Sequence, residues 1–482
     1  MAVDYDLVII GGSAVGRYAA AQAAQWARVA LVEPEPPAWN ELYHSTFLHA
    51  VHRAEPMGRS PHWGMQTRQS SFDLQKTIAW ARGVAENLED QGTEGRSLPL
   101  LAAAGVDVVI GRGEFLRRPR WGFSVNGRLL RSRAFLLAPA APCRIPAMAG
   151  LETSPYLTLD TVWQDPVWQK PFADRRVIWG NDPRGIELAQ AWRQLGIQVT
   201  IISPDVLLPQ ADREMANLMQ AHLEAIGVDI FTRAIVQRVD AAQKQIHLVW
   251  RDRAEESGGD RTLEADTLLL ATPPCIDLTS LNLDAVGVKW HPQGIIVNRK
   301  LQTTHPRIYA CGSALGGSAD FALARYEATL AVRNALFWPQ SAVRYGQVPF
   351  ALMTAPELAQ VGLTEAQARQ NYGAEVRVLK QFTKTLAKAQ IQGDPTGCCK
   401  LIVHRKGDIL GGHWVGTAAS EAIGIIALAM QQNIKLQAIA QLPMATPTHA
   451  ELLQAIAQQW RLTSWKAAGI ETWLSLRRDW SS

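Results

Sequence analysis

An apolar run that stops at a glycine-bearing turn constrains this chain more than any other feature. Residues 3–10 are apolar and partly β-branched, residues 11–16 read Gly-Gly-Ser-Ala-Val-Gly, and an alanine-rich segment follows at 18–27. This order of strand, tight turn and helix predicts a dinucleotide-binding fold, in which the free amides of the helix N-terminus face a pyrophosphate. Ser13 takes the place of the usual middle glycine and is small enough to admit a phosphate.

An acid after the second expected strand, at 28–32, supports the same fold. Glu33 lies 22 residues beyond Gly11, the spacing of the carboxylate that binds the adenosine ribose. Gly11 permits the tight turn, and Gly16 permits close packing of helix on strand. The predicted cofactor-binding residues of this first module are Gly11, Gly12, Ser13, Ala14, Gly16 and Glu33.

The same module occurs again in the middle of the chain. A strand at 176–179, the turn 180–185, a helix at 186–195 and a strand at 198–202 repeat the order. Asp182 stands at the middle-glycine position, where its carboxylate would repel a pyrophosphate, and Arg184 would offset that charge. Gly180, Arg184 and Gly185 are the candidates for holding a nicotinamide dinucleotide.

The end of this second module does not select a nucleotide. The strand stops at Ser203-Pro204, with no acid for a ribose hydroxyl and no arginine or histidine for a 2′-phosphate. The sequence therefore leaves three possibilities open: the second module binds NADH, it binds NADPH, or it binds neither.

Size and composition exclude several classes of protein. A chain of 482 residues suffices for about three domains of about 150 residues each, and a net charge of +4 is too small for a nucleic-acid binder. Five cysteines without a CxxC or CxxxxC pair indicate a reducing compartment and neither a disulfide framework nor a metal site. No signal peptide and no transmembrane segment is apparent, so we expect a cytoplasmic protein.

A C-terminal motif carries the most specific resemblance. Residues 354–365, Thr-Ala-Pro-Glu-Leu-Ala-Gln-Val-Gly-Leu-Thr-Glu, closely resemble the start of the dimerisation domain of class I pyridine nucleotide-disulfide oxidoreductases, the family of glutathione reductase and dihydrolipoamide dehydrogenase. Weaker similarities support it, and together they cover about residues 4–460: Phe-Leu-His-Ala at 47–50, Gly-Cys-Cys-Lys-Leu-Ile-Val at 397–403, Ile-Leu-Gly-Gly-His at 409–413 and Ala-Ser-Glu at 419–421.

The resemblance implies an α/β homodimer with two Rossmann-like dinucleotide-binding domains, for FAD and NAD(P), and a C-terminal α+β dimerisation domain. The expected parts are an FAD-binding domain at 1–150, an NAD(P)-binding-like domain at 151–272, an FAD-binding return segment at 273–345, a dimerisation domain at 346–464 and an extension at 465–482.

The chain departs from this family at the residues with which the family reduces disulfides. Counted back from Ala50, the second redox cysteine of the family falls at Glu41 and its flavin-side lysine at Ser45, while the first cysteine is lost in the short loop 34–37. Without these thiols there is no thiolate to attack a disulfide.

The acid/base motif of the family, His-Pro-Thr-x-x-Glu, is altered as well. Thr446 replaces the histidine, Glu451 is the retained acid, and His449 lies at a different offset. A threonine cannot move protons near neutral pH as an imidazole does, so no catalytic residue is certain.

Two flavin contacts implied by the resemblance are also changed. Ala138-Pro139-Ala140 replaces an Ala-Thr-Gly turn, and Gly312-Ser313 replaces the Gly-Asp that reaches the ribityl chain. Serine can donate a hydrogen bond but cannot make the charge-assisted contact of a carboxylate, which leaves the strength of FAD binding open. Glu187 stands at the family's position for an acid near the flavin. It is either that acid or a solvated helix carboxylate, because its lysine partner is gone.

Two further segments lie outside the family pattern. Seven arginines between Arg112 and Arg133 face one acid, Glu114, and on an antiparallel meander they form either a basic face for an acidic protein partner or a solvated surface. The tail places Ile470, Trp473, Leu474 and Arg477 at helical spacing, which suits contact with a membrane surface or packing on the dimer.

The leading hypothesis is an FAD-dependent oxidoreductase that passes electrons from NAD(P)H through the flavin to a non-disulfide acceptor, a quinone or an electron carrier. One alternative is a flavoprotein that no longer uses NAD(P)H and is reduced by a docked electron-carrier protein. Another is a non-enzymatic binding or regulatory dimer that reuses the fold.

Overall fold

The computed structural model describes residues 3–34, 41–58, 72–91, 97–118, 120–163, 174–242, 245–252, 259–317, 320–467 and 477. Contacts divide the chain into two compact units. The nucleotide unit comprises Met1–Val206 and Glu224–Val343, and the interface unit comprises Leu207–Leu223 and Arg344–Ser482. The loop at 35–37 and the tail residues Ile470, Trp473 and Leu474 lie outside the described residues.

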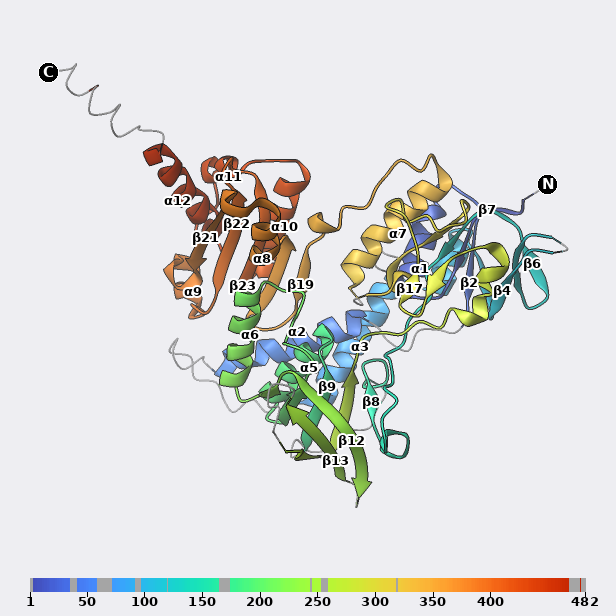
Figure 1. Cartoon of the computed structure of the whole chain (residues 1–482), viewed down its shortest axis with the longest axis horizontal. Helices are drawn as coiled ribbons and strands as arrows, with labels where there is room; N and C mark the ends of the chain where they lie inside the picture. The colour runs from blue at the N-terminus through green and yellow to red at the C-terminus, as the bar shows by residue number, and fades with distance from the viewer. Residues whose placement is uncertain are drawn as a thin grey trace. The chain divides into compact units, whose positions relative to one another are not determined.

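The first sheet of the nucleotide unit is parallel throughout, which confirms the predicted dinucleotide-binding fold (Figure 1). Its strand order is β18-β7-β1-β2-β3. The bounds are β1 Tyr5–Ile10, β2 Val29–Glu33, β3 Asp107–Ile110, β7 Ser132–Leu137 and β18 Ile308–Ala310.

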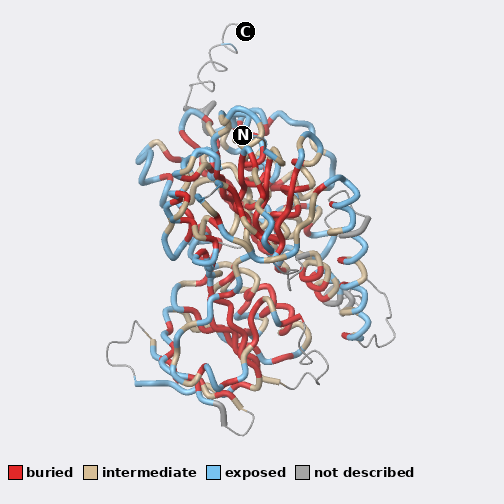
Figure 2. Tube along the Cα trace, turned by 90° about the vertical axis from the view of Figure 1, so that its right-hand side faces the viewer, coloured by how far each residue is buried: buried red, intermediate tan, exposed pale blue. Residues whose placement is uncertain are grey.

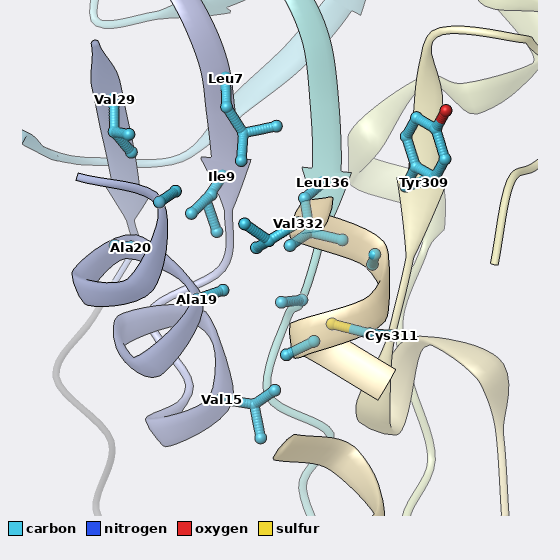
Figure 3. Packing of buried hydrophobic residues seen from close by; sticks show 14 of the residues in the cluster. Leu7, Ile9, Val15, Ala19, Ala20, Val29, Leu136, Tyr309, Cys311 and Val332 are labelled. Atoms are coloured by element: carbon cyan, nitrogen blue, oxygen red, sulfur yellow. The ribbon is translucent and has the colours of Figure 1, made fainter. Parts of the chain in front are cut away.

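Alternation along β1 divides its side chains between two cores. Leu7 and Ile9 pack against α1 (Ala14–Ala23) and α7 (Phe321–Leu336), where Ala19, Ala20 and Val332 meet them (Figure 3). Val8 and Ile10 face the other side of the sheet, where Phe115 and Phe123 belong to the same cluster. Because both faces of the sheet are covered, the runs 7–10, 29–32 and 134–137 of its strands are apolar without alternation.

The helices of both modules begin earlier than the sequence predicts. The first was expected from Tyr18 and the second from Ile186, but α1 begins at Ala14 and α5 spans Pro183–Gln194. Both predictions were wrong for the same reason, because the residue before each helix caps it. The Ser13 hydroxyl accepts from the Gly16 amide, and the Asp182 carboxylate accepts from the Arg184 amide.

The second module forms its own parallel sheet, in the order β11-β10-β9-β15-β8. Its bounds are β8 Leu157–Thr158, β9 Arg175–Gly180, β10 Gln198–Ile202, β11 Asp229–Phe231 and β15 Thr267–Ala271. An antiparallel sheet of β12 (Ala234–Ala242), β13 (Gln245–Asp252) and β14 (Arg261–Ala265) shares a hydrophobic cluster with it. Buried residues concentrate on the strands of these sheets (Figure 2).

Further helices of the nucleotide unit are α2 Glu41–Gly58, α3 Leu74–Gln91 and α4 Leu98–Ala103. An antiparallel meander, as expected for the arginine-rich segment, consists of β4 Gly113–Leu116, β5 Gly122–Val125 and β6 Arg128–Leu130, and a short hairpin consists of β16 Trp290–His291 and β17 Gly294–Ile295.

The interface unit contains an antiparallel sheet in the order β19-β20-β23-β22-β21. Most of α6 (Arg213–Ala225) also belongs to this unit. The strands are β19 Phe350–Leu352, β20 Glu357–Gly362, β21 Val376–Phe382, β22 Cys398–His404 and β23 Ile409–Gly416. The helices are α8 Glu365–Tyr372, α9 Ala387–Gln392, α10 Ala419–Gln431, α11 Leu436–Gln441 and α12 Glu451–Ala467. In the described part of the chain, no helix has the length and apolarity that crossing a bilayer requires.

A buried lysine ties this unit together. Lys400 on β22 is 2% exposed, and its Nζ lies 2.8 Å from carboxylate oxygens of both Asp212 and Glu365 and 3.2 Å from Glu214. Burial alone would lower the pKa of Lys400, but the hydrogen bonds to Asp212 and Glu365 outweigh it and raise that pKa. The lysine therefore stays charged and joins the segment 207–223 to the sheet.

Candidate functional site

The first glycine turn leaves no room for a side chain at Gly11 or Gly16. Gly11 has φ +124°, and a Cβ there would lie 2.3 Å from the carbonyl oxygen of Ala138. A Cβ on Gly16 would lie 2.1 Å from the carbonyl oxygen of Gly11. The Ser13 hydroxyl donates to Ala138 O at 2.7 Å while it caps α1, so the altered segment 138–140 forms the floor of the turn.

A buried arginine, which the sequence did not identify, holds the predicted ribose acid. Glu33 is fully buried at the end of β2, and Arg17 Nε on α1 donates to its Oε2 at 3.2 Å while the guanidinium also bonds Oε1. A Cβ on Gly12 would come within 2.1 Å of Glu33 Cγ, so the backbone of Gly12 lies directly over this carboxylate. The only signal in the sequence is a basic residue immediately after Gly16.

These residues fit the dinucleotide portion of FAD. The first-turn amides of Ala14 and Val15 have no carbonyl four residues earlier within the helix, which leaves them for an anion at the N-terminus of α1. Gly11 permits the tight turn and Gly16 the close packing of α1 on it, which together bring these amides to the carboxyl end of β1. The charge of Glu33 beneath the turn is compensated by Arg17.

The second segment that was predicted to contact the flavin lies at the same sheet edge, at the carboxyl end of β18. Gly312 has φ +62°, and its amide donates to Oε2 of the buried Glu327 on α7 at 2.7 Å. Ser313 follows in a single 3₁₀ turn and is partly exposed. Asp320 caps α7 by accepting from the amides of Ala322 and Leu323. Burial raises the pKa of Asp320.

Asp182 and Arg184 form a compensated pair at the second glycine turn. The Arg184 Nε and Nη2 donate to the two carboxylate oxygens of Asp182 at 2.9 Å each, and the side chains are 17% and 5% exposed. Burial would lower the pKa of Arg184, but the charge of Asp182 raises it. The neighbouring turn is as tight as the first, since a Cβ on Gly180 would lie 2.0 Å from Ala271 O and one on Gly185 would lie 2.6 Å from Ala271 Cβ.

Glu187 on α5 is neither solvated nor without a partner. It is 6% exposed, and its Oε2 lies 2.7 Å from Nε2 of His44 on α2, which is 3% exposed. The interpretation of Glu187 as a solvated helix carboxylate was therefore wrong. The sequence did not reveal His44 because it lies one residue before Ser45, the position at which the family lysine was sought.

An aromatic cluster surrounds this histidine. Trp163 stands edge-on to the rings of His44, Tyr43 and Phe47, with centroid distances of 5.4, 4.8 and 5.3 Å. Such contacts restrict the imidazole to one orientation.

The five cysteines are all free, and four of them are buried: Cys143, Cys311, Cys398 and Cys399. Burial raises the pKa of each of these four thiols, that of Cys398 to about 11. Cys275 is exposed and has no disulfide partner. Since the thiolate is the nucleophile in disulfide exchange, the four buried thiols are unsuited to it.

The altered acid/base motif forms a cap. The Glu451 carboxylate accepts from the Thr446 hydroxyl and, at 2.7 Å, from the Thr448 amide, and these bonds lower its pKa. His449 Nε2 lies 2.8 Å from Gln392 Oε1, and burial lowers its pKa. Glu451 thus stabilises the start of α12 in this chain.

The arginine-rich face is partly neutralised by distant acids. Ion pairs join Arg128 to Asp107, Arg131 to Asp4 and Arg133 to Asp6. The three aspartates all lie outside residues 112–133. Arg117, Arg118 and Arg120 remain exposed at the end of β4.

Two family patterns together match almost the whole chain. The sequence pattern of the pyridine nucleotide-disulphide oxidoreductase family matches residues 5–343, and that of its dimerisation domain matches residues 348–457. A mercuric reductase of Bacillus cereus is 29% identical over 89% of this chain and 67% of its own length. A dihydrolipoyl dehydrogenase of Bacillus subtilis is 29% identical over 93% of this chain and 96% of its own.

Solved structures show the same fold. LpdA from Mycobacterium tuberculosis superposes with a TM-score of 0.82 at 22% identity, over 94% of this chain and 99% of its own. The flavoprotein disulfide reductase RclA from Escherichia coli superposes with a TM-score of 0.77 at 23% identity, over 94% of this chain and 99% of its own. These structures share the fold, and the two family patterns confirm the resemblance seen in the motifs.

Proposed function

The chain belongs to the pyridine nucleotide-disulphide oxidoreductase family, and we propose that within it this protein transfers electrons from NAD(P)H through FAD to an acceptor that is not a disulfide. Members of this family are FAD-binding flavoproteins that use NAD(P)H, and the matched dimerisation domain supports a homodimer. A quinone or a small electron carrier is the acceptor class.

The state of the cysteines carries the proposal. The positions of the redox pair hold no cysteine, and the five cysteines elsewhere are unpaired, four of them with a raised pKa. The related mercuric reductase and dihydrolipoyl dehydrogenase are named for other substrates, and their chemistry does not transfer to a chain without that pair. Free thiols throughout also support the cytoplasm as its location.

The residues of the first turn would hold FAD. The amides of Ala14 and Val15 would bind its pyrophosphate, and the glycines at 11, 12 and 16 keep the tight turn that presents these amides. Gly312 and Ser313, at the same sheet edge, would contact the chain between pyrophosphate and ring, with serine as a hydrogen-bond donor. FAD, when bound, supplies the two-electron chemistry, and the protein positions the two reactants.

The second turn would hold the nicotinamide dinucleotide. Asp182 alone would repel a pyrophosphate, but its two bonds to Arg184 neutralise it, and both side chains stay within the turn. Gly180 and Gly185 allow the turn and the start of α5 to pack closely on Ala271, as the glycines of the first turn do on Ala138. The arrangement is therefore compatible with nucleotide binding despite the missing glycine.

An absorbance experiment tests the proposal. Purified protein that contains FAD is titrated anaerobically with NADH or NADPH, and the reduced protein is mixed with a quinone, with glutathione disulfide or with lipoamide. We expect bleaching of the flavin band by one nicotinamide, rapid recovery with the quinone, and no faster recovery with either disulfide than with buffer. Failure of both nicotinamides to bleach the flavin, or recovery driven by a disulfide, contradicts the proposal.

The second candidate, reduction by a docked electron carrier, is favoured by the exposed arginines 117, 118 and 120. Encounters between a basic face and an acidic carrier are screened by salt. Reduction by an acidic ferredoxin or flavodoxin that slows as salt rises, together with no reduction by nicotinamides, would select this candidate. A salt-independent rate would count against it.

A further inference from the structure

Three large aromatic side chains stand exposed where α1 and α7 end. Trp26 follows the C-terminus of α1 and is 62% exposed, while Phe337 and Trp338 follow the last residue of α7 and are 59% and 83% exposed. The rings of Trp26 and Phe337 meet edge to face, with centroids 6.4 Å apart, so the three residues form one surface, the aromatic patch. Tryptophan is mostly buried on average, so exposure of this extent indicates a binding surface.

The aromatic patch is presented by a fixed backbone. The helices α1 and α7 pack on one another in the first hydrophobic cluster (Figure 3). Beyond Trp338 the chain is held by Asn334, which is 1% exposed and whose side chain donates to the carbonyl oxygens of Lys300 at 3.0 Å and Ser341 at 2.8 Å. The rings therefore project from an ordered surface.

The surroundings of the aromatic patch are basic. Four exposed cations lie beside it along the chain or next to the bonds of Asn334, and they form the basic rim: Arg28, Arg299, Lys300 and Arg333. None of them has an ion pair with an acid of the described residues. Asp6, whose carboxylate accepts from the Arg28 amide, is already paired with Arg133. The segments 7–32, 285–319 and 328–356, which carry patch and rim, contain no aspartate or glutamate, so the positive charge is uncompensated.

The aromatic patch lies at the edge of the first sheet opposite the predicted cofactor site. The helices α1 and α7 follow the carboxyl ends of β1 and β18 and run back toward the amino ends of the strands. Ligands of such sheets bind at the carboxyl edge. A partner at the amino edge therefore leaves the cofactor edge unoccupied.

The size of the aromatic patch favours a lipid surface over a protein. An aromatic side chain offers about 150–250 Å², so three rings with these exposures offer roughly 300–500 Å². A stable protein–protein interface needs about 800 Å² from each partner. A membrane sets no such minimum, and it attracts tryptophan to the headgroup level and cations to its anionic lipids.

We propose that the amino edge of the first sheet docks on an anionic membrane surface, with the aromatic patch at the headgroup level and the basic rim against the lipid phosphates. The attachment is peripheral, by side chains at helix ends. The inference goes beyond the proposed function, because it requires neither flavin nor nicotinamide. A membrane is also where a lipophilic quinone, one of the acceptor classes, is dissolved.

Sedimentation of the full chain with lipid vesicles tests the inference. We expect the wild-type protein to bind vesicles of equal parts phosphatidylcholine and phosphatidylglycerol, and to bind them less as salt rises. Trp338→Ser should lower the partition coefficient roughly tenfold or more. Arg333→Gln should lower it about fivefold, and only on the anionic vesicles.

An exposed tryptophan on another element provides the matched control. Trp80 on α3 is 49% exposed, and Trp80→Ser should bind vesicles as the wild type does. Since Trp80, Trp338 and Arg333 are exposed, their variants should unfold in urea like the wild type. If Trp338→Ser nevertheless fails to fold, Trp26→Ser decides in its place.

Three results would overturn the inference. The first is no binding to the anionic vesicles, or equal losses in Trp338→Ser and Trp80→Ser. The second is a loss in Trp473→Ser alone, which would assign the binding to the C-terminal extension. The third is a lower molecular mass of Trp338→Ser than of the wild type in analytical ultracentrifugation without lipid, which would make the aromatic patch a contact between copies of the chain.

Discussion

Arg17 holds the carboxylate of Glu33 beneath the backbone of Gly12, and both side chains are buried. The acid at the end of the second strand is the usual ribose ligand of a dinucleotide fold. Here it is also one half of an ion pair within the chain. The pair therefore links the stability of α1 and β2 to the nucleotide site.

Replacement of Arg17 should destabilise the nucleotide unit. In Arg17→Met, Glu33 remains buried without its cation, and loss of one partner from a buried pair costs about 3–5 kcal/mol. Urea unfolding of the apoprotein measures this loss. Arg131→Met breaks a solvent-exposed pair with Asp4, which water screens, so it should lower the free energy of unfolding much less than Arg17→Met does. Equal losses in the two variants would contradict the prediction.

The Gly12→Ala variant should lose FAD. Its new Cβ would lie 2.1 Å from Glu33 Cγ, so the buried pair must move at the point where the nucleotide backbone approaches. The ratio of flavin to protein absorbance after purification reports retention. Gly83→Ala is the control, because Gly83 lies within α3 with nothing within 4 Å of the added Cβ, and there the substitution should stabilise the helix by about 0.5–1 kcal/mol and leave the flavin in place.

The Arg184→Met variant tests the second turn. Without the guanidinium, the buried carboxylate of Asp182 faces the incoming pyrophosphate uncompensated. We expect the KM for the preferred nicotinamide to rise roughly tenfold or more, equivalent to about 1.4 kcal/mol, with kcat nearly unchanged. Steady-state kinetics measure both constants, and an unchanged KM would show that no dinucleotide binds at this turn.

The buried Lys400 should matter more to the interface unit than its exposed neighbour. Lys400→Met leaves the buried Asp212 without its cation and should lower the free energy of unfolding by about 3–5 kcal/mol. Lys380→Met removes an exposed pair with Glu214 and should cost less than about 1 kcal/mol. Urea unfolding of both variants, compared with the wild-type protein, distinguishes the two, and equal losses would contradict the prediction.

The free energy of unfolding should fall as the pH drops below about 6.5, the ordinary pKa of histidine. Burial lowers the pKa of His305, His413 and His449 in the folded chain, so the unfolded chain binds these protons first. Their contribution is fully present above the unfolded pKa and is lost below it, at up to about 1.4 kcal/mol per pH unit for each proton. Urea unfolding from pH 5 to 8 measures the slope, and His413→Asn should flatten it.

The modules of the fold could be predicted from local patterns. The apolar runs, glycine turns and alanine-rich segments depend on residues within a few positions of one another, and the parallel sheets of the structure confirm them. The start of α1 was misplaced because Ser13 was considered as a phosphate contact and not as a helix cap. The roles of the predicted cofactor-binding residues stay predictions.

Contacts between distant segments could not be predicted in the same way. The seven arginines looked uncompensated because Asp4, Asp6 and Asp107 are remote in sequence, and only the sheet places them beside Arg131, Arg133 and Arg128. His44 and Glu187 are 143 positions apart, so neither residue type indicates the other until α2 and α5 pack together.

The sequence by itself determined that two dinucleotide modules and a dimerisation domain are present and that the redox thiols are missing, because covalent order and residue identity suffice for those conclusions. The tertiary structure decided which distant side chains pair, Arg17 with Glu33 and His44 with Glu187, whereas the pairing of Arg184 with Asp182 could be expected from their positions in one turn. Such pairing depends on burial and on distances of a few ångströms between helices and strands, which the packing of the whole unit sets.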